Sequence, residues 1–80
     1  MFIASVVDCD GEYIVVEQRN RFKIGDTLQI LSTDESFGKE FVVESMTDMN
    51  GNVVEDAKNV QQKLKIKCPY KLSKYDILRK

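Results

Sequence analysis

Residues 3–16 read IASVVDCDGEYIVV, which is two apolar segments on either side of an aspartate-glycine pair. Such a pair between two apolar segments is a strong signal for a tight β-hairpin, because the turn needs residues that accept a positive φ. The stretch therefore predicts two antiparallel strands, at 3–7 and 13–16, joined by a short turn at Asp10-Gly11.

The rest of the chain repeats this alternation of apolar segments and turn residues. Its four glycines lie 14, 13 and 13 residues apart, each in a polar stretch between apolar segments. That spacing is typical of strands joined by tight turns. Asn50-Gly51 before Val53-Val54 predicts a second hairpin. Further strands are expected from their alternation and composition at 27–31, 41–46, 63–68 and 77–79. Residues 56–62 alone have helical character and predict a single helical turn.

These elements predict one small domain. Eighty residues, 42% of them hydrophobic, suffice for a single core. We expect an all-β fold, a small antiparallel β-barrel spanning residues 1–80, because closure removes the exposed edges of short strands. The longest apolar runs are three or four residues, so neither a membrane span nor a signal peptide is expected. A cytoplasmic location is expected.

The side chains needed for catalysis are largely missing. The sequence has no histidine, which removes the commonest general base and any Ser-His or Cys-His nucleophile within this chain. Its two cysteines, Cys9 and Cys68, lie far apart without a C-x-x-C spacing, so we expect buried free thiols. We predict no catalytic residue, no metal site and no cofactor, and therefore no enzyme activity for the chain alone.

Charge is distributed unevenly along the sequence. Residues 1–56 hold four basic and twelve acidic side chains, a balance of −8, whereas residues 57–80 hold eight basic and one acidic, a balance of +7. Such segregation indicates either pairing between neighbouring strands or a basic face that meets a polyanion.

Lys63, Lys65 and Lys67 are expected on one face of a strand, opposite Leu64 and Ile66. We call these three lysines the lysine stripe. Their spacing of roughly 6.6 Å is twice the rise per residue and is similar to the separation of phosphates along an extended nucleic-acid strand. The alternative is a solvated face whose lysines protect an edge strand.

A polar loop, EQRNRFKIGD at residues 17–26, supplies two further candidates. Arg19 and Arg21 can present planar guanidinium groups to phosphate or carboxylate. The alternative is that Arg19 pairs with Glu17 or Glu44 across the sheet.

Several segments together resemble a known family. They are VVEQRNRF at 15–22, Gly25-Asp26, Asp48-x-Asn50-Gly51, Gln61-Gln62 and YDILRK at 75–80. In this order they resemble the C-terminal domain of the collagenase-like peptidase family U32. The resemblance covers nearly the whole chain and implies a small β-barrel similar to the second domain of elongation factor Tu.

The resemblance implies an accessory domain of a larger enzyme. Members of the family are described as peptidases or collagenases, and some relatives act with partners in hydroxylating a tRNA or ribosomal RNA base. Their chemistry belongs to a larger preceding catalytic domain, which is the expected partner of this chain. The first hypothesis is a domain that helps to hold a substrate, RNA, through Lys63, Lys65, Lys67, Arg19 and Arg21. The alternative is a structural lid or dimerisation module that docks on the catalytic domain. An autonomous protease is the least supported reading.

Overall fold

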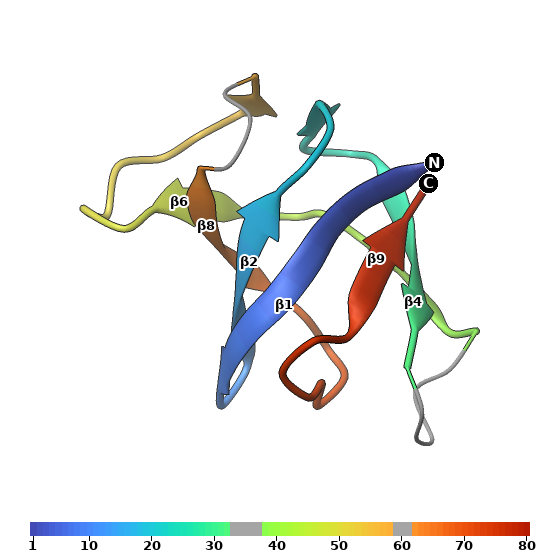
Figure 1. The fold of residues 1–80 in the computed structure, drawn as a ribbon. Coiled ribbons are helices and arrows are strands. Elements are labelled where there is room, and N and C mark those ends of the chain that lie inside the picture. The colour runs from blue at the N-terminus through green and yellow to red at the C-terminus, as the bar shows by residue number, and fades with distance from the viewer. Residues whose placement is uncertain (33–37, 59–61) are drawn as a thin grey trace.

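The computed structural model describes residues 1–32, 38–58 and 62–80 (Figure 1). Nine strands and no helix occur within these residues. The strands are β1 (Phe2–Asp10), β2 (Tyr13–Gln18), β3 (Phe22–Lys23), β4 (Thr27–Leu31), β5 (Glu40–Val42), β6 (Met46–Asp48), β7 (Asp56–Ala57), β8 (Lys63–Lys67) and β9 (Ile77–Arg79). Seven of them form one antiparallel sheet in the order β5-β4-β9-β1-β2-β8-β6, and β3 pairs with β7 separately.

The large sheet curls around a single core. In Figure 1, β1 and β9 lie in front, and the chain after β4 passes behind them to reach β6. Alternate residues of each strand point inward, as Leu64 and Ile66 of β8 do, and both are fully buried. The buried apolar residues form one contiguous cluster. This curled sheet is a half-barrel, so the predicted small antiparallel β-barrel is confirmed.

The first hairpin forms as expected. Asp10 pairs with Tyr13 across the turn, and Gly11 there has a φ of 62°, which a side chain would disfavour. The pairing of β1 with β2 shifts register between Val6 and Asp8. Such a bulge bends a strand. β1 pairs with β2 on one side and with β9 on the other, so a bend in β1 fits the curl of the sheet.

Residues 41–46, predicted as one strand, are divided between two. β5 ends at Val42 and β6 begins at Met46, and these strands lie at opposite edges of the sheet. Between them the Val43 amide donates to the Asp26 carbonyl, 2.9 Å away. The chain must leave β5 here because it crosses the molecule to the other edge.

The second predicted hairpin turn is confirmed at Asn50-Gly51. One carboxylate oxygen of Asp48 accepts the amides of Asn50 and Asn52, at 2.9 and 3.0 Å. Val53 makes a single bridge to Thr47 instead of starting a strand.

The helical turn predicted at residues 56–62 is wrong where the structure describes it. Asp56–Ala57 is strand β7, with Ala57 opposite Phe22 of β3. The buried side-chain amide of Gln18 donates to the Ala57 carbonyl, which fixes this segment in an extended form. The cause is a tertiary contact that outweighs a weak local preference. Residues 59–61 of the predicted turn lie outside the described residues.

Three aspartates are held in their charged form. Hydrogen bonds from Asn52, its backbone amide first, lower the pKa of Asp48. A hydrogen bond from Arg21 lowers the pKa of Asp56. Burial raises the pKa of Asp26, but hydrogen bonds from the Lys80 ammonium group and the Lys23 amide outweigh it, and the net shift is downward.

We therefore expect the domain to lose stability in acid. The pKa values of these carboxyls in the folded state lie below the ordinary value of 3.8, so the unfolded chain binds more protons. Their contribution is present above pH 3.8 and is lost as the pH falls through the lower folded values. Urea unfolding followed by circular dichroism should give a falling midpoint from about pH 5 downward. Asp48→Asn should reduce this dependence, with Glu55→Gln as the control for removing an exposed carboxylate. An unchanged dependence in Asp48→Asn would contradict the assignment.

Candidate nucleic-acid interface

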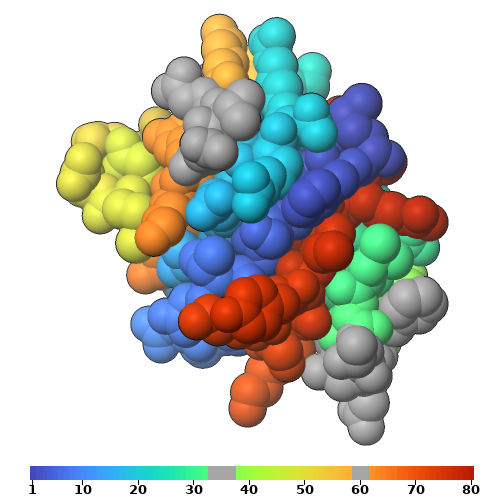
Figure 2. All heavy atoms as spheres, viewed as in Figure 1, coloured from blue at the N-terminus to red at the C-terminus, as the bar shows by residue number. Residues whose placement is uncertain are grey.

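The lysine stripe lies on the outer face of the curled sheet. β8 runs between β2 and β6, and Figure 2 shows it in orange on the face toward the viewer. Lys63 is opposite Glu17, Lys65 is opposite Val15, and Lys67 is opposite Tyr13. The predicted alternation is confirmed, because the residues between these lysines are buried in the core. Lys63 and Lys67 are exposed, and Lys65 is half-buried.

The positive charge of the stripe is not neutralised by neighbouring carboxylates. Within the described residues, none of its three ammonium groups makes an ion pair. Glu17, the cross-strand neighbour of Lys63, is instead bound by Arg19, with Nη2 3.1 Å from Oε1. Part of the basic charge at the end of the sequence therefore stays unpaired as the stripe on this face, whereas Lys80 of the same segment is paired with Asp26.

An aromatic side chain that the sequence analysis missed lies beside the stripe. The side chain of Tyr13 is 40% exposed, and the Lys65 ammonium group lies 5.1 Å from the centre of its ring. Such a cation–π contact holds ring and ammonium side by side. The sequence did contain a signal for this position. Ile14 and Val16 point inward, so the alternate residues Tyr13, Val15 and Glu17 lie on the outer face of the strand.

The two arginines are placed differently. Arg19 directly follows β2, and its guanidinium group binds Glu17. Because Glu17 lies opposite Lys63, this guanidinium group lies near the Lys63 end of the stripe. The expected alternative, pairing of Arg19 with Glu17, is found, but between residues two apart at the end of β2 and not across the sheet. Arg21 directly precedes β3 and donates from Nε and Nη2 to Asp56, at 3.1 and 2.6 Å. That hydrogen bond raises the pKa of Arg21. Arg19 therefore lies near the stripe, whereas Arg21 is bound to Asp56 of β7.

The two cysteines differ in burial. Cys68 is buried and Cys9 is half-buried, and both are free thiols. Burial raises the pKa of the Cys68 thiol, so this side chain stays neutral and a poor nucleophile at neutral pH. Across the described parts of the chain, no three cysteine, aspartate or glutamate side chains are grouped so that they could hold a metal ion.

Nothing in the described chain is a helix able to cross a membrane.

The family comparison agrees with the sequence resemblance. A family model described as the peptidase family U32 C-terminal domain matches residues 1–79. The chain belongs to this family. It is therefore the C-terminal domain of a larger U32-family protein, and we refer to it below as the U32 C-terminal domain. No curated protein matched the chain.

Two solved structures are similar to this U32 C-terminal domain over their whole fold. Both are crystal structures of the C-terminal domain of a Geobacillus thermoleovorans protein assigned to the U32 peptidases, each 29% identical to this chain. The selenomethionine form has a TM-score of 0.93 and covers 100% of this chain and 99% of its own. The other has a TM-score of 0.92, with coverage of 98% and 89%. In that relative, the domain was crystallised separately from the rest of its protein.

Proposed function

We propose that the U32 C-terminal domain helps its full-length protein to hold an RNA substrate in the cytoplasm. The observation that carries the proposal is the lysine stripe, three ammonium groups on one strand face without a carboxylate partner in the described residues. Ammonium groups in such a row can follow a phosphate backbone, and the release of its counterions favours binding.

The neighbouring side chains suggest a division of roles. Lys63 and Lys67 are exposed and would contact phosphates directly. Tyr13, held by Lys65, offers an exposed ring on which a base can stack. Arg19 would contribute by sharing its guanidinium group between Glu17 and a phosphate. Arg21 would act less directly, because its guanidinium group is already bound to Asp56.

The catalytic step of the full-length protein belongs, on this proposal, to the preceding domain. This chain has no histidine, and the thiol of its buried cysteine is kept neutral. Peptide cleavage and RNA hydroxylation, the activities implied by the family resemblance, are therefore assigned to the rest of the protein. The U32 C-terminal domain would position the substrate.

A titration of the 80-residue domain with labelled bulk tRNA tests the proposal. Fluorescence anisotropy should give a dissociation constant of about 1–100 μM at about 50 mM salt. With three phosphate contacts on a single strand, raising the salt to about 200 mM should weaken binding roughly 20-fold. Absence of binding at the lower salt concentration would contradict an RNA-holding role.

The second candidate is a docking module on the preceding domain. The observation that favours it is Phe2, an aromatic side chain on β1 that is 42% exposed next to Arg79 on β9. Light scattering and a pull-down with the separated preceding domain would test it. A domain that stays monomeric and ignores the preceding domain would contradict this candidate.

A further inference from the structure

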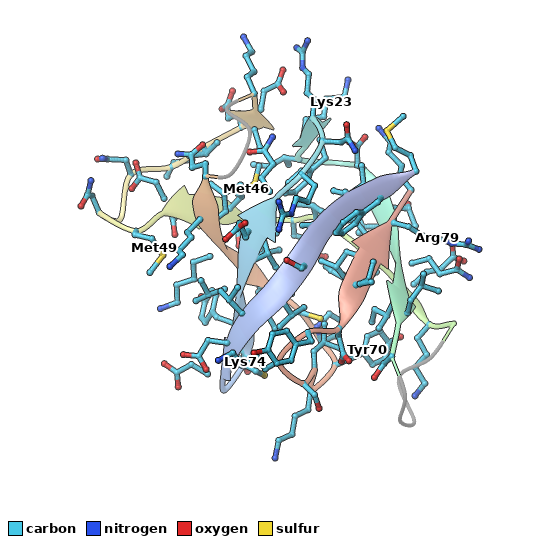
Figure 3. All side chains as sticks on the ribbon, in the orientation of Figure 1. Lys23, Met46, Met49, Tyr70, Lys74 and Arg79 are labelled. Carbon is cyan, nitrogen blue, oxygen red and sulfur yellow. The ribbon has the colours of Figure 1, made fainter. Side chains whose placement is uncertain are left out.

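A groove separates the free edge of β5 from the far end of β8. Its volume is about 660 Å³, within the range of ligand sites. The β1–β2 turn and the loop after β8, which form one wall, lie at the lower end of the molecule in Figure 1. Phe41 and Cys68 are buried at its base, and Tyr70, labelled in Figure 3, lines it from the loop. The groove is thus the unclosed seam of the half-barrel.

β5 forms the other wall and is an edge strand of the described sheet, so the backbone groups on its open side have no partner strand there. Among the residues that the structure describes, β5 pairs only with β4, and the flanking Lys39 carbonyl and Val43 amide bond to Ile30 and Asp26 on that side. In an antiparallel pair, alternate residues direct their backbone groups toward the partner strand. The amides and carbonyls of Glu40 and Val42 therefore point away from β4, toward the open side.

Charged side chains line both walls of the groove. Glu40 and Glu44 lie along β5 and just beyond it, and Glu12 lies in the β1–β2 turn. All three are exposed, and within the described chain none takes part in an ion pair. Lys67 and Lys71 line the same wall as Glu12, opposite β5, and Lys71 has a further interaction within the domain. A ligand running along β5 therefore meets the carboxylates of Glu40 and Glu44, and at the start of the strand it meets the Lys39 ammonium group, which lies 5.1 Å from the centre of the Tyr70 ring.

We propose that this groove binds an extended, basic polypeptide segment, which adds to β5 as a further strand. The segment's backbone would bond to the outward amides and carbonyls of Glu40 and Val42, as in other cases of strand addition. Its side chains would alternate. One would lie over Phe41, and its basic neighbours would lie beside Glu40 and Glu44. This proposal does not depend on RNA binding by the lysine stripe.

A second copy of the domain is a less suitable occupant. Pairing of two β5 edges would bring a second set of the same carboxylates to the seam, and like charges on adjacent strands repel. A basic segment instead satisfies the backbone groups, the apolar base and the carboxylates together.

Labelled model peptides test the proposal on the 80-residue domain, which corresponds to the unit that crystallised separately in the relative. The probes are Lys-Val-Lys-Val-Lys, its counterpart Glu-Val-Glu-Val-Glu, and the basic peptide methylated at alternate backbone nitrogens. Anisotropy at about 0.15 M salt should detect binding of the basic peptide and at least a roughly tenfold weaker affinity for the other two. Equal affinity for basic and acidic peptides, or no binding of the basic one, would overturn the proposal.

Two variants locate the site. Val42→Pro removes one outward amide, and proline is tolerated at such an edge position, so peptide affinity should fall roughly tenfold with little change in thermal midpoint. Glu40→Lys combined with Glu44→Lys should weaken binding of the basic peptide about fivefold or more. Glu55→Lys, on an exposed loop outside the groove, controls for the reversal of one exposed carboxylate elsewhere on the surface. If Val42→Pro does not fold, the paired charge reversal still decides the outcome. Unchanged affinity in that pair, or a dimer in solution that the pair abolishes, would contradict a peptide site.

Discussion

Replacement of Lys63, Lys65 and Lys67 by glutamate should weaken binding of tRNA to the U32 C-terminal domain by about a hundredfold at low salt. The change removes the ammonium groups of Lys63 and Lys67 that would contact phosphates and the one of Lys65 that holds Tyr13, and it places three carboxylates along the same phosphate path. The dependence of binding on salt should also nearly disappear, because its slope reports the number of phosphates contacted. Anisotropy titrations at two salt concentrations measure both effects.

A second triple variant separates the stripe from the overall charge of the domain. Lys39, Lys58 and Lys74 are exposed and lie outside β8, and their replacement by glutamate changes the net charge by the same amount. This control should reduce affinity far less than the stripe variant. Equal losses in the two triple variants would show that the general field, and not the stripe, attracts RNA.

Phe22→Ala should lower the free energy of unfolding by about 3–5 kcal/mol. Phe22 is 1% exposed and belongs to the core cluster, so its removal leaves a cavity as well as lost burial. The total free energy of unfolding of a domain of this size is about 4–12 kcal/mol. The variant should therefore be close to unfolding at room temperature. Urea denaturation followed by circular dichroism measures the loss.

The matched control for this prediction is Phe2→Ala. Phe2 is the same type of residue, but it is 42% exposed at the start of β1. Its truncation should therefore lower the free energy of unfolding by less than about 1 kcal/mol. A similar loss in both variants would mean that the segment around β3 is not anchored through the Phe22 ring.

Elements with a local signal could be predicted from the sequence. Strands β4 and β9 have the predicted bounds, and β8 differs by one residue, because alternation and flanking turns are encoded within a few residues. β3 and β7 have no such signal, since each is two residues long. They are held by distant contacts, the Gln18 amide on the Ala57 carbonyl and the bond from Arg21 to Asp56, which no local pattern reveals.

The same contrast between local signals and distant contacts applies to the candidate interface. The alternation of the lysine stripe is local and could be predicted. The position of Tyr13 beside Lys67 depends on the register between β2 and β8, strands far apart in sequence. The groove beside β5 was not predicted either, because its walls come from three separate segments of the chain.

The place of β9 in the sheet has a consequence for how the chain folds. β9 is the last strand in sequence, yet it lies between β1 and β4, with Ile77 opposite Ser5 and Leu31. Until Ile77–Arg79 has left the ribosome, β1 and β4 therefore have no strand to join them. Such distant pairings give a high contact order and slow folding, on the scale of milliseconds to seconds. We therefore expect the sheet to close only after synthesis of β9, with the inner faces of β1 and β4 open to chaperones until then.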